Sequence, residues 1–284
     1  MSATTAVRAR AVAAHPARFR DLLASEWLKL WSLRSMRWAL VVTALAIILL
    51  NANAAYADYV NWSRYDEGIR AHFVPDWSLR DAFSNNSGIT LMLIAASLGS
   101  MAVVSEYATG MVRTTFAAVP ARRALMTAKV AVLTAVMTVY GVVIAGGSFW
   151  LTQAILSGRG VGISITYPGV VWGVLASALL APVSALVGFG LGALIRHSAT
   201  TIVANVVVLL LIPNFLNDDR YWSATLNHAL PFRAWQRLLQ LEAPLPTPSL
   251  PYPATGATGS WLVFALWGVV AAVVAVGVVE RRDA

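Results

Sequence analysis

The segment 105–124 carries the residues of this sequence that are best suited to contact another protein. It lies between two long apolar stretches and begins with Ser105-Glu106. A glycine, a proline and several cations follow, namely Gly110, Arg113, Pro120, Arg122, Arg123 and, just beyond the segment, Lys129. A carboxylate and guanidinium groups can form charge-assisted hydrogen bonds with a partner. A short link between two helices needs only a few residues to reverse direction, so the additional charges favour a docking surface.

The residue types needed for catalysis or metal binding are missing or scattered. The chain has no cysteine, which excludes disulfides and thiolate sites. Its histidines are far apart in the sequence, at His15, His72, His197 and His228. Neither a phosphate-binding P-loop nor a Gly-x-Ser-x-Gly elbow occurs. We therefore expect no catalytic residue, cofactor or metal in this chain, and any ATP hydrolysis would have to take place on a separate protein.

The composition is that of an integral membrane protein, with 58% hydrophobic and 12% charged residues. A helix that crosses the hydrocarbon layer needs about 20 apolar residues, and lipid favours helices because they satisfy their own backbone hydrogen bonds. Six segments approach this length, at 38–57, 88–104, 125–156, 168–195, 200–216 and 261–279. The sequence thus predicts an all-α membrane protein with six transmembrane helices.

The cations are unequally distributed among the segments that join these spans. If the N-terminus is cytoplasmic, 14 of the 21 lysine and arginine residues fall in cytoplasmic segments, in agreement with the positive-inside rule. Both termini are therefore predicted to be cytoplasmic. The net charge of +8 follows this topology and suits anionic lipid headgroups, so we expect membrane lipids and no nucleic acid as partners.

Residues 17–35 precede the first span and have the pattern of an amphipathic helix. A large apolar residue recurs every four positions, at Phe19, Leu23, Trp27 and Trp31. This pattern suits a helix in the headgroup region, although a positively charged anchor for the first span is a simpler alternative. Ala52-Asn53-Ala54 resembles a signal-peptidase site, but the region before it is too long for a secretory signal, so we expect the first span to be retained.

Small residues and amides mark the inside of the spans. In the segment 168–195, small residues recur every four positions in two series, Gly173, Ser177, Ala181 and Ala185, and Ser184, Gly188 and Gly192. This spacing permits close helix packing within one subunit, across a dimer or along a transport path. Pro182 predicts a kink or a freed carbonyl group. Asn205 could contact a substrate, but a hydrogen bond to another helix is the more common role of such an amide.

Two longer segments are predicted on the outer side. Aromatic residues in the segment 58–87 favour an interfacial belt or simple packing over a lid on a ligand. The segment 217–260 contains Pro231 followed by apolar residues at helical spacing, which predicts a short amphipathic helix that starts at the proline. The proline-rich stretch that follows predicts an extended linker.

The order of these anchors relative to the spans resembles that of ABC-2 type transporter permeases. Besides the 105–124 connector, the similar features are Glu26-Trp27-Leu28-Lys29, Leu230-Pro231-Phe232 and the closing Glu280-Arg281-Arg282-Asp283. The resemblance covers most of the chain. It implies one permease domain over 1–284, with residues 17–35 as the elbow helix, and an external gate formed by a re-entrant region near Leu230.

By the same resemblance, the chain would be the permease subunit of an ATP-driven exporter in the plasma membrane. Its partners would be a separate ATP-binding subunit, which holds ATP and magnesium, and a second permease subunit. The substrate would be hydrophobic or amphipathic. The residues implied to couple permease and ATPase are Glu26, Lys29, Glu106, Gly110, Arg113, Pro120, Arg122 and Arg123, and those considered for the substrate path are Gly188, Gly192 and Asn205.

Two other functions stay open. A stand-alone membrane enzyme would need a polar cluster at one face, for which His72, Asp76 and Asp81 are the available residues. A structural or sensory membrane protein without transport would also be compatible with the small-residue helices and the charged connector.

Overall fold

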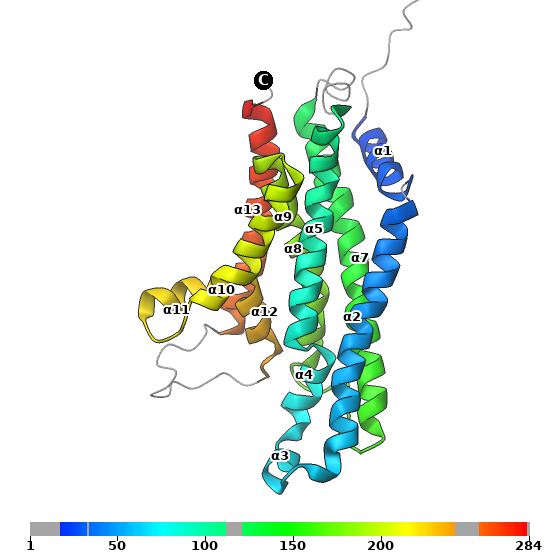
Figure 1. Ribbon diagram of the computed structural model, residues 1–284, viewed down its shortest axis with the longest axis vertical. Helices are drawn as coiled ribbons and strands as arrows, with labels where there is room; N and C mark the ends of the chain where they lie inside the picture. Colours follow the sequence, from blue (N-terminus) through cyan, green and yellow to red (C-terminus); the bar gives the residue numbers. More distant parts are fainter. Residues whose placement is uncertain (1–17, 33, 112–120, 242–255, 283–284) are drawn as a thin grey trace, which may run out of the picture.

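The computed structural model describes residues 18–32, 34–111, 121–241 and 256–282, and within these ranges it contains helices and turns without strands (Figure 1). Six helical segments are long and apolar enough to cross a membrane. They are α2 (Arg34–Asn61), α5 (Asn85–Ala108), α7 (Arg122–Ser157), α8 (Val170–Ile195), the continuous series α9 (Ser198–Val206), η3 (Val207–Leu211) and α10 (Ile212–Phe215), and α13 (Ala257–Arg282). The prediction of an all-helical protein with six helices long and apolar enough to span a membrane is therefore confirmed.

Shorter elements precede and join these spans. Helix α1 (Phe19–Ser32) lies beside α2 and α7 at one end of the bundle (Figure 1). The link between α2 and α5 contains η1 (Trp62–Arg64), α3 (Glu67–Ala71), the π-helical η2 (Phe73–Trp77) and α4 (Ser78–Ala82). Its aromatic side chains pack on one another, with Trp62 and Phe73 edge to face at 5.1 Å between ring centroids. Helices α11 (Tyr221–His228) and α12 (Pro231–Leu239) follow α10 in the chain and precede α13. Helix α12 starts at Pro231, as predicted.

Helix α7 is longer than a single crossing requires. Its 36 residues correspond to about 54 Å at 1.5 Å per residue, whereas the hydrocarbon layer is about 30 Å thick. It begins three residues before the predicted span, at Arg122. The first turns of α7 therefore extend the helix beyond the apolar segment and carry its cations to the end of the bundle where α1 lies.

Helix α8 forms the centre of the bundle. In its most apolar window 72% of the residues are buried, compared with 11% in α13. Small residues allow α8 to be buried so closely. A Cβ on Gly188 would collide with the carbonyl group of Ala96 in α5. A Cβ on Gly99 of α5 would likewise collide with the carbonyl group of Ala185. Both predicted small-residue series of α8 are thus used for packing within one chain.

The buried Pro182 leaves α8 continuous from Val170 to Ile195. Proline has no N–H to donate to the carbonyl group four residues earlier, which belongs to Ala178. Gly141 of α7 lies so close to this carbonyl that a Cβ would collide with it. The absence of a side chain lets the Cα–H of Gly141 approach the freed oxygen, a weak but favourable contact.

We predict that Gly188→Ala lowers the thermal unfolding temperature of the purified protein in detergent. The free energy of unfolding should fall by about 1–3 kcal/mol or more, since this is the usual cost of overpacking a core. The matched control is Gly146→Ala in α7, where nothing lies within 4 Å of an added Cβ. Because alanine favours a helix over glycine by about 1 kcal/mol, the control is expected to be neutral or stabilising. Equal effects of the two variants would contradict close packing at Gly188.

Candidate functional site

An apolar contact fixes α1 against the start of α7. Leu22 is buried against Leu125 and Ala128, in a small cluster separate from the main core. One helical turn beyond Leu22 lies Glu26, and the residue that follows Ala128 is Lys129. The contact therefore places this carboxylate and this ammonium group opposite each other.

Four charged side chains meet at this position, and we call them the charge cluster: Glu26, Lys29, Glu106 and Lys129. The Lys129 ammonium donates hydrogen bonds to Glu26 at 2.5 Å and to Glu106 at 2.8 Å. Lys29 donates to the same two carboxylates, at 2.7 Å and 3.1 Å. Two carboxylates and two ammonium groups compensate each other, so the cluster joins α1, α5 and α7 without a net charge.

The inner half of the cluster is withdrawn from the surroundings. The side chains of Glu26 and Lys129 are 4% and 5% exposed, whereas that of Lys29 is 37% exposed. Burial alone would lower the pKa of Lys29, but its hydrogen bond to Glu26 and the charges of Glu106 and Glu26 outweigh this effect, so its pKa is raised above the ordinary value. Lys29 thus stays charged at neutral pH and keeps both carboxylates paired.

The end of α5 is held from a second side. The guanidinium group of Arg196, in the turn between α8 and α9, lies 4.6 Å from the ring centroid of Tyr107, a cation–π contact. Glu106 and Tyr107 are consecutive, so the last turn of α5 is tied both to α1 and α7 and to the end of α8. Just beyond it, Gly110 has a φ of 71°, a left-handed conformation that glycine adopts without steric cost.

The structure brings three of the predicted coupling residues together, namely Glu26, Lys29 and Glu106. Gly110 follows the end of α5, and Arg122 and Arg123 form the first turn of α7, whereas Arg113 and Pro120 lie outside the described residues. Glu26 and Lys29, three residues apart on α1, form a direct hydrogen bond. Glu26 is nevertheless directed inward, so it serves the junction of the helices and not a surface contact.

Sequence reasoning missed the role of Lys129 as the centre of the cluster. A signal was present, because the chain has only two lysines and Lys129 interrupts an apolar run. An ammonium group within such a run needs a carboxylate partner. Its partners are 23 and 103 residues away in the sequence, so only the fold identifies them.

The residues considered for a substrate path lie in a helix interface. Asn205 of α9 donates a hydrogen bond to Ser100 of α5 at 2.8 Å, and Ser100 donates in turn to the carbonyl group of Gly188 at 2.9 Å. Gly192 faces Val103 of α5 at close range. The hydrogen bond between helices that the sequence favoured for Asn205 is confirmed, and the three residues together join α5, α8 and α9.

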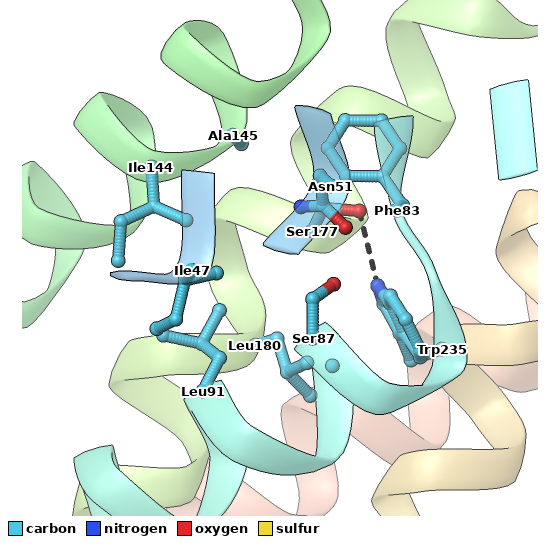
Figure 2. A pocket seen from close by; sticks show the side chains of 11 residues that line it. Ile47, Asn51, Phe83, Ser87, Leu91, Ile144, Ala145, Ser177, Leu180 and Trp235 are labelled. Carbon is cyan, nitrogen blue, oxygen red and sulfur yellow. Dashed lines mark hydrogen bonds between the residues drawn. The ribbon is translucent and has the colours of Figure 1, made fainter. Parts of the chain in front are cut away.

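A pocket lies at the other end of α5, beside α12 (Figure 2). Its empty space is about 240 Å³, counting the part open to the surroundings. Trp235 of α12 closes one side, where its indole N–H donates to Ser177 of α8 at 3.0 Å and its ring leaves no room for a Cβ on Gly88. A water-sized sphere can reach about 10 Å³ of it, far less than the roughly 300–1,000 Å³ of cavities that hold drug-sized ligands, so the pocket is closed to them in this conformation.

The residues considered for a membrane enzyme, His72, Asp76 and Asp81, differ in their surroundings. His72 and Asp76 are exposed, and Asp81 is buried. The His72 ring contacts the Gly68 carbonyl group of its own helix at 2.9 Å. Among the described residues, no group of three or more histidine, aspartate or glutamate side chains is arranged to hold a metal ion.

No family model matches the sequence, and a search of curated proteins finds no match.

We predict that Lys129→Met destabilises the protein by about 3–5 kcal/mol, because removing one partner of a buried ion pair leaves uncompensated charge. Lys29→Met, at the exposed edge of the cluster, is the control and should cost less. Adding Glu26→Gln to Lys129→Met should restore part of the loss, since the two residues interact directly. Unfolding of the three variants in detergent tests this, and a Lys129→Met protein as stable as the Lys29→Met control would contradict it.

Proposed function

We propose that this chain is the permease subunit of an ATP-driven exporter of the ABC-2 type. The observation that supports this best is the charge cluster, which fastens an amphipathic helix to the two helices that flank the 105–124 connector. A link that only reversed the chain direction would not need this support. A connector that receives force from an ATPase would need it, because the force must reach the spans.

In this proposal, a separate subunit binds and hydrolyses ATP with magnesium. Closure of two such subunits pushes on the connectors of two permease subunits in the plasma membrane, whose termini are cytoplasmic. Arg122 and Arg123 would form charge-assisted contacts with the ATPase. Glu26, Lys29, Glu106 and Lys129 position the ends of α1, α5 and α7, so that the three helices move together.

Trp235 is suited to close the transport path at the outer side. The residue is 1% exposed, and its ring closes the pocket on the side of α12 (Figure 2). Withdrawal of α12 would break one hydrogen bond to Ser177 and open the pocket toward the outside. Apolar side chains form most of the pocket lining, which suits a hydrophobic or amphipathic substrate.

The docking step can be tested by purifying the C-terminally tagged protein from native membranes in mild detergent and identifying its partners by mass spectrometry. A P-loop ATPase should co-purify, and Arg122→Glu with Arg123→Glu should reduce its recovery at least tenfold. Arg64→Glu with Arg70→Glu, a double reversal at the opposite end of the molecule, is the control and should leave recovery unchanged. Recovery unaffected by the first pair would exclude docking through these arginines.

The gating step can be tested with single cysteines, because the chain has none of its own. Ser87 lines the pocket and is 3% exposed, so Ser87→Cys should resist a membrane-impermeant maleimide in the resting protein. With the ATPase partner and ATP, its labelling rate should rise at least tenfold, while Ser63→Cys at an exposed position is labelled in both conditions. A constant slow rate for Ser87→Cys during ATP hydrolysis would contradict gating by α12.

A further inference from the structure

Asp81 is a buried carboxyl group at the end of the molecule opposite the charge cluster. It lies on α4, which packs against α2, α7 and η2 (Figure 1). The residue is 8% exposed, and its Oδ2 atom is buried without a hydrogen-bond partner among the described residues. An ionised carboxylate is costly to bury when no donor compensates its charge, so this position favours the neutral acid.

The polar groups closest to Asp81 in the fold serve other partners. The guanidinium group of the exposed Arg80 lies 5.2 Å from the ring centroid of Trp77, a cation–π contact. Gln153, an uncharged side chain that α7 places against α4, donates its amide N–H to the carbonyl group of Ser78 at 2.9 Å. Neither side chain therefore supplies the donor that an ionised Asp81 would need.

The group that faces Asp81 from α2 is a second carboxyl group, that of Asp58, within hydrogen-bond reach. Asp58 also accepts a hydrogen bond from the hydroxyl group of Tyr65 at 2.6 Å. This bond raises the pKa of Tyr65 to about 12, so the phenol keeps its proton at alkaline pH. On η2, the acidic residue Asp76 is exposed. Two carboxylates this close repel each other, and one proton between them removes the repulsion.

We propose that Asp81 carries a proton at neutral pH and donates a hydrogen bond to Asp58, so that one proton joins α4 to α2. A proton needs no cavity, which suits a junction that is closed to water. The assignment does not depend on the transport function, because it requires no ATPase partner.

The proton also acts on the wall of the pocket beside α12. Its release to water would leave two negative charges facing each other, and their repulsion would separate α4 from α2. Phe83, which lines the pocket, follows directly after α4. The next residue, Ser84, donates its backbone N–H to Asn51 of α2 at 3.1 Å. Ionisation of Asp81 would therefore loosen the segment that forms this wall.

The first test is thermal unfolding of the full-length protein in detergent. An aspartate in water has a pKa of about 3.9, so unfolding at neutral pH releases the proton that the folded protein holds, and this release favours unfolding. Asp81→Asn keeps a donor and has no proton to release. It should therefore unfold several degrees above the wild type at neutral pH, and the difference should shrink as the pH falls to about 4.

The matched control is Asp76→Asn, at an exposed position close to α4, which should unfold at the wild-type temperature. An Asp81→Asn protein that unfolds at or below the wild-type temperature at neutral pH would show that Asp81 is ionised and stabilised by a partner, and would overturn the proposal.

Infrared difference spectroscopy detects the proton directly. At neutral pH the wild type and Asp76→Asn should show the C=O stretching band of a protonated carboxylic acid, and Asp81→Asn should lack it. Calcium chloride should leave the band unchanged. A missing band in the wild type, or its loss on addition of calcium, would show that a metal cation and not a proton is bound there, or that the site is ionised, and either result would overturn the assignment.

Hydrogen–deuterium exchange tests the release of α4. At alkaline pH, peptides that cover residues 78–84 should exchange several-fold faster in the wild type than in Asp81→Asn, because only the wild type gains a second negative charge. At neutral pH the two proteins should exchange at the same rate. Comparison at equal pH cancels the intrinsic pH dependence of exchange, and equal rates at alkaline pH would overturn the role of the proton in joining α4 to α2.

Discussion

The close contact between the backbone of α8 and its neighbours is the constraint on which the rest of the structure depends. At Gly188, Gly99 and Gly141, a methyl group would collide with a carbonyl group of the facing helix. Lipid tails are as apolar as leucine, so burial alone gives helices in a membrane little reason to associate. Close contact supplies the dispersion energy instead, and it fixes the positions of α5 and α7 against α8.

Polar pairs then specify how the other helices join this centre. Each pair links two elements: Thr43 with Tyr140, Asn51 with Ser148, Gln153 with Ser78, Asn205 with Ser100, and Trp235 with Ser177. An unpaired amide or hydroxyl group in an apolar surrounding is costly, so a shift of one helix by a turn would be penalised at several places. The charge cluster extends the same principle to the helix ends, where full charges replace amides.

The sequence predicted the features that follow from local composition. The six apolar segments, the presence of a separate helix before the first span and the start of α12 at Pro231 agree with the structure, because hydropathy, helical periodicity and the fixed φ of proline act within a few residues. The bounds of that first helix, Phe19–Ser32, are narrower than the predicted 17–35. Partners could not be predicted in this way. Nothing near Lys129 in the sequence indicates Glu26, and nothing near Gly88 indicates that an indole from α12 fills the space beside it. Such contacts are decided by the helix arrangement.

In the proposed exporter, these contacts also determine which helices can move. Helix α5 connects the charge cluster with the pocket near α12. Its Glu106 belongs to the charge cluster, and its Gly88 lies against Trp235 at the pocket. Sliding α5 along α8 would force Gly99 and Gly188 out of register, and packed interfaces of this kind have discrete arrangements and do not deform continuously. Force at the connector therefore moves α5, α7 and α8 as one body. The relative motion that opens the path is then expected between this body and the α13 and α9–α10 segments, which are the least buried of the spans. Helix α12 lies against both α8 and α13, so a displacement between these two helices would withdraw Trp235 without a separate signal.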